Sequence, residues 1–314
     1  MSTTRTLVCG SIAVDTIMVF PDRFGRHILP ERTHMLSVSF HIGDMRREWG
    51  GCAGNIAYNL KALGGQPVML ATVGDDGDAY RARFESLGIT TEGLRTVPGA
   101  FTAQAYIITD LDDNQITAFH PGAMNESHQT HLDDVASVGL AIVGPDGREG
   151  MLAHVAELAA AGVPFIFDPG QALPLFSGAE LTQMVEAADY VAVNDYEGHL
   201  LSERTGLSLT EIAGRVDALI ETRGSEGSRI YADGAVIDVP IVPAKAVVDP
   251  TGCGDAYRAG LLYGIAEQWS WERTGRLASM LGAIKIASRG GQNHRVNRDE
   301  LAALYDSHFR QNLW

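Results

Sequence analysis

The stretch Asp249-Pro250-Thr251-Gly252-Cys253-Gly254-Asp255 leads directly into an apolar, helix-type pattern that starts at Ala256. Two glycines just before a helix leave backbone N–H groups free to point at one place, and the helix dipole adds partial positive charge there. The stretch therefore predicts a site for an anion such as a phosphate group. On spacing alone Asp255 has two interpretations: an acidic residue that favours the start of a helix, or a general base beside a bound phosphate.

The lysines exclude one large class of phosphate-transferring proteins. The chain contains no GxxxxGK[ST] pattern, and none of its lysines, which are Lys61, Lys245 and Lys285, follows a glycine. If the protein transfers phosphate, it does so without a P-loop.

A second glycine-rich stretch, Gly50-Gly51-Cys52-Ala53-Gly54-Asn55, also precedes a helix-type pattern. One interpretation is a tight turn with a helix start. The other is that Gly50 and Gly51 let a polyhydroxyl ligand approach the backbone while Asn55 donates to and accepts from its hydroxyl groups. Asp15, at the end of an apolar strand pattern, is either a solvated edge residue or an acceptor for two neighbouring hydroxyls.

Regular alternation of strand and helix patterns begins near residue 133. Strands are expected over 140–143, 164–168 and 190–194, with helices over 151–161 and 181–188 between them. Such alternation implies an α/β fold with a mainly parallel central sheet flanked by helices. Further helices are expected over 54–63, 78–87, 209–220, 256–268, 272–287 and 299–309, strands over 6–10 and 68–73, and a two-stranded excursion over 229–239.

Two β-rich segments, 14–50 and 99–119, lie outside this alternation. The first contains the alternating residues Leu36, Val38 and Phe40, and the second has a hairpin pattern with the polar tip Asp112-Asp113-Asn114. We predict a single domain over 1–314 in which these segments form a small β-sheet lid.

The composition narrows the classes of partner. Lys and Arg number 24 and Asp and Glu 39, so the formal charge is 24 − 39 = −15, which argues against a nucleic-acid or anionic-membrane partner. No uninterrupted apolar stretch is long enough for a membrane span, and no signal-peptide pattern is expected at the N-terminus. The three cysteines, Cys9, Cys52 and Cys253, contain no CxxC pair. We expect a cytoplasmic protein without a disulfide framework.

Taken together, the two glycine-rich stretches resemble the signatures of the ribokinase-like, PfkB-type carbohydrate kinases. The Gly50 to Asn55 stretch is similar to the N-terminal signature, and Asp249 to Asp255 to the C-terminal D-x-T-G-x-G-D signature. The resemblance covers essentially the whole chain. It implies that Asp255 is the base that deprotonates the acceptor hydroxyl, and that the amides of Gly252, Cys253 and Gly254 stabilise the transferred phosphoryl group.

The resemblance also implies an ATP site with Mg²⁺. Asn194 to Glu197 is similar to the N-x-x-E motif that organises magnesium and phosphate, with Glu197 acting indirectly. Apart from the resemblance, the better interpretation of this stretch is a polar strand end that caps a helix. The Thr222, Gly224 and Gly227 turn would lie near the ATP phosphates. Gly290 to Asn293 matches a loop that closes over adenine and, in many members, a monovalent cation. Asp249 and Thr251 would share that cation site, which leaves a K⁺ requirement open.

Two residues depart from the signature without removing its backbone donors: Pro250 stands where many members have Thr, and Cys253 where Ala is more frequent. A thiol at a helix N-terminus can have a lowered pKa and be sensitive to oxidation. Simple packing is the other interpretation of Cys253.

The acceptor is expected to be a ribonucleoside, because several stretches resemble the nucleoside kinase, adenosine kinase-like branch of the family: 24–30, 113–124 and 167–171. ATP would phosphorylate the 5′-hydroxyl of adenosine, inosine or guanosine, as in purine salvage, with Asp15, Gly51 and Asn55 on the ribose. A nucleoside also needs an apolar or aromatic slot for its base, for which the candidates are Phe101, Phe119, Met124 and Gln171.

Two alternatives remain at this stage. One is a free-sugar kinase for ribose or fructose, and the other is a non-catalytic nucleotide-binding protein of the same fold. Exposed strand edges of the lid would allow a homodimer to form through it.

Overall fold

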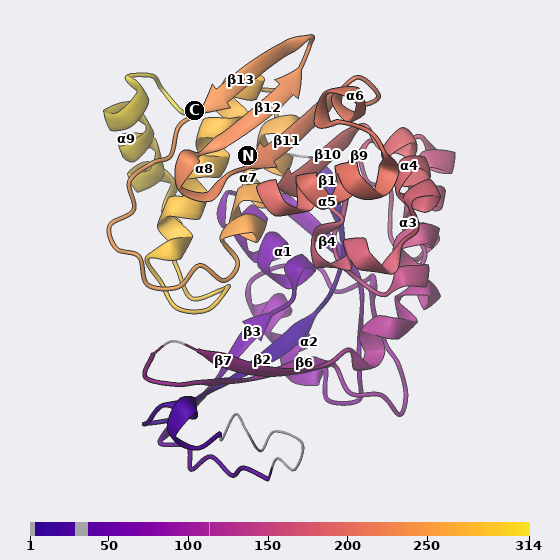
Figure 1. Ribbon diagram of the computed structural model, residues 1–314. Helices are drawn as coiled ribbons and strands as arrows, with labels where there is room; N and C mark the ends of the chain where they lie inside the picture. Colours follow the sequence, from indigo (N-terminus) through magenta and orange to yellow (C-terminus); the bar gives the residue numbers. More distant parts are fainter. Residues whose placement is uncertain (1–3, 29–36, 113) are drawn as a thin grey trace.

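The computed structural model describes residues 4–28, 37–112 and 114–314, and the main chain forms two sheets (Figure 1). The larger sheet has the strand order β13-β12-β11-β10-β9-β8-β1-β4-β5. Neighbouring strands are parallel from β11 to β5, and β12 and β13 are antiparallel additions at one edge. Its strands are β1 (Arg5–Cys9), β4 (Gln66–Val73), β5 (Leu94–Thr96), β8 (Leu140–Val143), β9 (Phe165–Phe167), β10 (Tyr190–Asn194), β11 (Ala218–Thr222), β12 (Ser228–Ala232) and β13 (Ala235–Val239).

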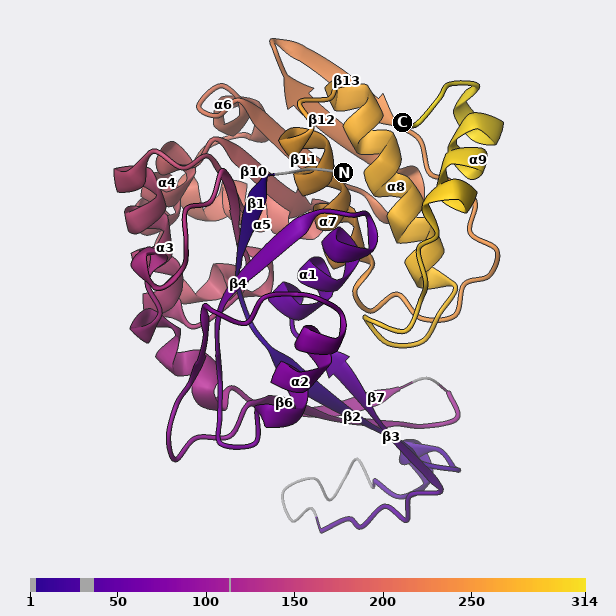
Figure 2. The same cartoon turned by 180° about the vertical axis from the view of Figure 1, so that it is seen from behind.

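Helices cover both faces of the larger sheet, as the two opposite views show (Figures 1 and 2). Alternate residues of β1 enter separate cores, with Leu7 and Cys9 in one and Val8 in the other. The Val8 side is covered by α1 (Cys52–Ala62), α2 (Asp78–Ser86), α7 (Cys253–Ala266), α8 (Trp271–Ile286) and α9 (Arg298–Phe309). The other side is covered by α3 (Arg148–Ala161), α4 (Gly178–Ala187), α5 (Asp195–Thr205) and α6 (Leu209–Ala213). This layered arrangement confirms the predicted α/β fold.

Short 3₁₀ helices occupy several connections: η1 (Phe24–Arg26), η3 (Gly122–Gln129), η4 (Leu132–Asp134), η5 (Gly170–Leu175) and η6 (Gly224–Glu226). Within the described part of the chain, every helix is too short or too polar to cross a bilayer.

The second sheet has four strands in the order β3-β2-β6-β7 and extends away from the helices (Figures 1 and 2). It consists of β2 (Ala13–Val19), β3 (Asp44–Gly50), β6 (Ala103–Thr109) and β7 (Gln115–His120), so the two segments expected outside the alternation do form one small sheet. Asp15 pairs with Glu48 and Ala105, and Ala105 pairs with Phe119. Directly paired residues lie on one face of a sheet, which we call the Asp15 face.

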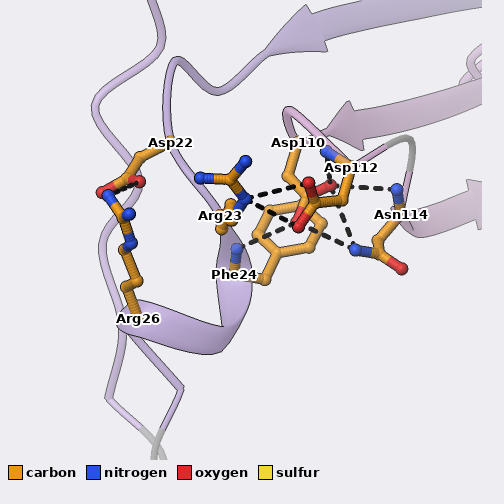
Figure 3. A network of polar contacts seen from close by, with 7 residues as sticks. All are labelled: Asp22, Arg23, Phe24, Arg26, Asp110, Asp112 and Asn114. Carbon is orange, nitrogen blue, oxygen red and sulfur yellow. Dashed lines mark hydrogen bonds and ion pairs between the residues drawn. The ribbon is translucent and has the colours of Figure 1, made fainter.

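A polar network fixes the outer end of this sheet (Figure 3). The Asp110 carboxylate accepts hydrogen bonds from the backbone N–H groups of Phe24, Asp112 and Asn114 at 2.9 Å each. Arg23 forms an ion pair with Asp112 at 2.8 Å. The connection after β2 and the turn between β6 and β7 are thereby tied together, although most of the ionic groups are exposed.

Two parts of the sequence interpretation need correction. The helix expected over 209–220 ends at Ala213, and residues 218–222 form β11. Ala218, Leu219 and Ile220 are fully buried between β10 and β12, and a short apolar run of this kind fits a buried strand and a helix equally well by periodicity. No bounds were predicted for helix α5, but the interpretation of Asn194 to Glu197 as a strand end that caps a helix is confirmed, because the two residues form the capping box of α5.

The alternation of Leu36, Val38 and Phe40 does not mark a strand in the part that is described. Leu36 lies outside the described residues, Val38 and Phe40 are in irregular structure, and β3 begins at Asp44. Phe40 instead packs against Phe20 and Phe24 at ring-centroid distances of 4.9 and 5.0 Å. Local aromatic packing therefore accounts for Phe40.

Candidate active site

A pocket of about 830 Å³ lies where the carboxyl ends of β9, β10 and β11 meet the amino end of α7. In parallel sheets ligands bind at this edge, because the strand ends and the following loops converge there. Residues from the predicted sites line it, namely Gln171, Asn194, Glu197, Thr222, Gly224, Gly227, Gly252, Cys253, Gly254 and Asp255.

The turn that opens α7 supplies backbone donors to this pocket. Gly252 has φ of +78°, a conformation that favours glycine, and α7 begins at the next residue. The amide of Cys253 donates to the Pro250 carbonyl at 3.1 Å. Among the residues that the structure describes, no backbone carbonyl accepts a hydrogen bond from the Gly254 amide. This amide is therefore available to an anion at the positive end of the helix dipole.

Asp255 lies at this turn and is held by Asn55, whose amide nitrogen donates to Oδ2 of Asp255 at 2.8 Å. Burial raises the pKa of Asp255 to about 7. The hydrogen bond from Asn55 acts to lower this pKa, whereas the negative charges of Asp168 and Asp15 act to raise it. A carboxyl group with a pKa near neutrality can both accept and release a proton at physiological pH.

Asp15, on β2 of the second sheet, is not among the residues that line this pocket, but its charge contributes to the raised pKa of Asp255. Burial, together with the charges of Glu48 and Asp249, raises the pKa of Asp15 to about 6. A Cβ atom at Gly50 would lie 2.6 Å from Oδ2 of Asp15, and one at Gly51 would lie 2.4 Å from the Ser11 carbonyl oxygen. The two glycines are thus needed where strand β3 passes close to Asp15 and to the connection between β1 and β2.

Behind Asn55 lies a buried network that sequence reasoning missed. The amide nitrogen of Gln292 donates to Oδ1 of Asn55 at 3.2 Å and to the Tyr80 hydroxyl at 2.7 Å. The Tyr80 hydroxyl donates to the Gly50 carbonyl at 2.5 Å. The network therefore connects Asp255 to the end of β3. Gln292 is adjacent to the Gly290-Gly291 pair, but nothing in the sequence around Tyr80 indicates this role.

A buried ion pair in the pocket was also missed. Nε of Arg258 lies 3.0 Å from Oδ2 of Asp168, and its Nη2 lies 3.9 Å from Oε2 of Glu197. Glu197 in turn exchanges hydrogen bonds of 2.7 Å with Asn194 across the start of α5. Because Arg258 is one helical turn after Asp255, the spacing of the two residues on α7 is the signal that would have found it.

The far end of the pocket is apolar, with a lining that includes Ile241, Val242, Val247, Ala283 and Ile286. The lining residues do not include Gly290 and Asn293, although the sequence interpretation placed them at the adenine. The Gly290 amide donates to Asp249 at 2.8 Å, and the Asn293 side chain donates to Glu48 of β3 at 2.5 Å. This loop therefore links the turn before α7 to the second sheet.

The residues expected around a base are divided between two places. Gln171 lines the large pocket. Phe119 is on the Asp15 face and 51% exposed, and Phe101, just before β6, is 61% exposed. Met124 is in η3, where the amide of the preceding Ala123 donates a hydrogen bond to the Phe101 carbonyl at 2.8 Å.

The turn expected to hold a monovalent cation is already occupied by protein donors. The Asp249 carboxylate accepts from the amides of Thr251 and Gly290 at 2.9 and 2.8 Å. Burial acts to raise its pKa, but these hydrogen bonds and the Lys285 charge hold the pKa of Asp249 below its usual value. Nζ of Lys285 donates to the Asp249 carbonyl at 2.8 Å.

Burial raises the pKa of the neighbouring Cys253 thiol to about 11, which argues against an oxidation-sensitive thiolate there.

Comparison with known proteins gives a consistent result. Residues 16–298 match the pfkB family carbohydrate kinases. A nucleoside kinase of Methanocaldococcus jannaschii is 30% identical over 274 residues, which cover 87% of this chain and 90% of that protein. The solved structure of the Burkholderia thailandensis nucleoside kinase in complex with inosine is 52% identical, with a TM-score of 0.89 over 98% of this chain and 99% of the other. The same kinase in complex with ADP-inosine is 53% identical, with a TM-score of 0.87 over 98% and 97% of the two chains.

Proposed function

The chain is an ATP-dependent kinase that belongs to the pfkB family of carbohydrate kinases, in its nucleoside kinase branch, and from this premise we propose that it phosphorylates the 5′-hydroxyl of a purine ribonucleoside. The products would be the nucleoside 5′-monophosphate and ADP. The observation that supports the proposal is the Asp255 carboxyl group, which lies in the first turn of α7 just after the glycine turn and accepts a hydrogen bond from Asn55.

The two ends of the pocket suit the two ends of ATP. The apolar lining around Val242 and Ile286 provides a slot for adenine, and Asn194, Thr222 and Gly224 provide polar groups and exposed backbone for the phosphates. The γ-phosphoryl group then lies against the Gly252 and Gly254 amides, where the positive end of α7 stabilises its charge.

The acceptor approaches from the side of the second sheet. Asp15 accepts hydrogen bonds from the ribose hydroxyls, and Asn55 holds both the ribose and Asp255. Asp255 takes the proton of the 5′-hydroxyl as that oxygen attacks the γ-phosphorus atom. The bond between the γ-phosphorus and the bridging oxygen breaks, and its electrons leave with ADP. Catalysis consists mainly of positioning and of charge stabilisation.

Mg²⁺ fits the polar end of the pocket as an ion that arrives with ATP. The described residues include no group of three or more His, Cys, Asp or Glu side chains that could hold a metal alone. Asn194 and Glu197 line the pocket and would hold the ion through its waters. Bound there, Mg²⁺ would neutralise charge on the phosphates.

One solved relative supports a purine nucleoside as the acceptor. The Burkholderia thailandensis kinase, 52% identical, was solved with inosine. The exposed ring of Phe119, on the Asp15 face, can stack on a base whose ribose is bound at Asp15. We assign the second sheet the role of a lid that closes over the ribose and excludes water.

A panel of acceptors tests the proposal. ADP release is measured with adenosine, inosine and guanosine and, in parallel, with ribose and fructose. We expect turnover with at least one purine nucleoside and little with the free sugars. Turnover with ribose but with none of the nucleosides would replace the proposed acceptor by a free sugar, and no turnover with any of them would contradict the proposed reaction.

The outer face of the lid is proposed to pair with a second copy of the chain. Met45, Tyr106 and Ile116 lie on the face opposite Asp15 and are 62%, 42% and 40% exposed. Pairing would cover this apolar surface. Sedimentation of the wild type and of Tyr106→Glu would show a dimer that the substitution dissociates; a wild-type monomer would contradict the pairing.

A further inference from the structure

Lys285, in the last turn of α8, is fully buried although its side chain carries a charge. Nζ donates to two backbone carbonyl oxygens, that of Asp249 at 2.8 Å and that of Ser288 at 3.0 Å. Lysine is rarely this buried unless its ammonium group is fully satisfied. The positive charge of Lys285 therefore lies beside Asp249, the first residue of the turn that leads to the phosphate site.

The ammonium group joins two segments that border the active site. One is the segment from Asp249 to Asp255, and the other is the loop after α8 that carries Gly290. The same two segments are joined by the hydrogen bond from the Gly290 amide to the Asp249 carboxylate and by those from the Val248 and Asp249 amides to the Ile286 carbonyl at 2.9 and 3.1 Å. Lys285 is the cation of this junction, and Asp249 is its anion.

This arrangement does not fit a bound K⁺ ion at the turn. K⁺ prefers uncharged or anionic oxygen atoms, and the carbonyl oxygen of Asp249 already accepts from an ammonium group. Both carboxylate oxygens of Asp249 accept from backbone amides. A second cation at these oxygens would also be repelled by the buried charge of Lys285, which is screened little by solvent.

We infer that the ammonium group of Lys285 takes the place of a monovalent cation in this kinase: as a positioning residue it holds the Asp249 to Asp255 turn, so that phosphoryl transfer proceeds without K⁺. The kinetic test of this inference rests on the proposed function, because it measures phosphoryl transfer to a purine nucleoside. It predicts a cation dependence that is absent from the wild type and appears only when the lysine is shortened.

The test compares the wild type in KCl, NaCl and tetramethylammonium chloride at equal ionic strength. The inosine-dependent rate of ADP release is expected to agree within about twofold in the three salts. A rate at least fivefold higher in KCl would overturn the inference. If the wild type is active on neither inosine nor another purine nucleoside, the proposed acceptor fails instead, and thermal unfolding in the same three salts still tests whether K⁺ stabilises the protein.

Two variants separate positioning from packing. Lys285→Ala removes the charge and opens a space, so we expect its kcat to fall at least tenfold in tetramethylammonium chloride and to recover several-fold in KCl. Lys285→Met fills the space without a charge, so its loss is not restored by KCl. The Tm of Lys285→Ala should rise with KCl while that of the wild type stays constant. Lys61→Ala, at the end of α1, serves as the matched control, and its kcat should equal that of the wild type.

A kcat of Lys285→Ala equal to that of the wild type would overturn the inference. An equal loss in Lys285→Ala and Lys285→Met with no response of either to KCl would overturn it as well, because that pattern shows a structural role alone. Should either variant fail to fold, the response of the wild type to the three salts decides the question.

Discussion

The turn from Asp249 to Asp255 and the four-stranded lid contribute to one site but are held in different ways. The turn is fixed by partly buried hydrogen bonds with Lys285, Gly290 and Asn55. The lid is extended from the main body and leaves large apolar side chains exposed on both of its faces. The difference suggests a division of labour, in which the rigid turn carries the chemistry and the exposed sheet chooses and covers the acceptor.

The largest effect is expected when the carboxylate of Asp255, in the rigid turn, is replaced by an amide. Asp255→Asn can still accept the hydrogen bond from Asn55 but cannot take the proton of the 5′-hydroxyl. The value of kcat with inosine should fall on the order of 10² to 10⁴-fold, while ATP binding measured by calorimetry stays close to that of the wild type. A variant that keeps the wild-type kcat would remove Asp255 from the mechanism.

How far the sequence could predict the site depends on whether a feature is local. The glycines before α7 and the acid after them follow one another in the chain, so their geometry could be expected from the sequence. Tyr80 and Gln292 come from segments 212 positions apart, and only the packing of α1, α2 and the loop after α8 brings them to Asn55. The apolar slot around Val242 was missed because it lies in an irregular connection without periodicity.

The fold shows the same limit. The alternation of strand and helix patterns was sufficient to predict the parallel sheet. The two segments outside this alternation were expected to form a separate sheet. The error at 209–220 arose where Ala218 to Ile220 satisfy helix and strand patterns alike. Burial on both faces of the sheet, which decides the matter, is a property of the folded molecule.

A second prediction distinguishes the loss of the anion site from the loss of stability that any side chain at a positive φ would cause. Gly252→Ala and Gly206→Ala both place a side chain at positive φ, 78° and 73° respectively, and each should lose about 1–2 kcal/mol of stability. Only Gly252→Ala alters the amides that face the phosphoryl group, so its kcat should fall about 10²-fold. Equal kcat values in the two variants, measured with inosine and saturating ATP, would contradict an anion site at this turn.

A third prediction concerns the connection between the two regions. Tyr80→Phe leaves the Gly50 carbonyl and the Gln292 amide without their shared hydroxyl, which should cost about 1–3 kcal/mol of unfolding free energy. Asn55 would then orient Asp255 less well, and kcat/KM should fall about tenfold, equivalent to about 1.4 kcal/mol. Tyr190→Phe, on β10, is the control and should change neither quantity. An unchanged kcat/KM in Tyr80→Phe would show that the network is structural only.

The smallest effect is expected in the lid. Phe119 is half exposed, so Phe119→Ala should leave the fold intact and raise KM for inosine about fivefold, near the lower end of base–aromatic stacking energies. The value of kcat should not change, because the transfer chemistry lies in the turn. A lowered kcat with an unchanged KM would contradict the division of labour between lid and turn.

The most direct measurement is the pH dependence of kcat/KM for inosine in the wild type and in Asp255→Asn. Because burial raises the pKa of Asp255 to about 7, and only the ionised form can accept the proton, the wild-type value should fall about tenfold for each pH unit below 7. The residual activity of Asp255→Asn should lack the decline near pH 7 and fall only near pH 6, where Asp15 takes up a proton. The same decline near pH 7 in both proteins would show that another group accepts the proton, and would contradict the role assigned to Asp255.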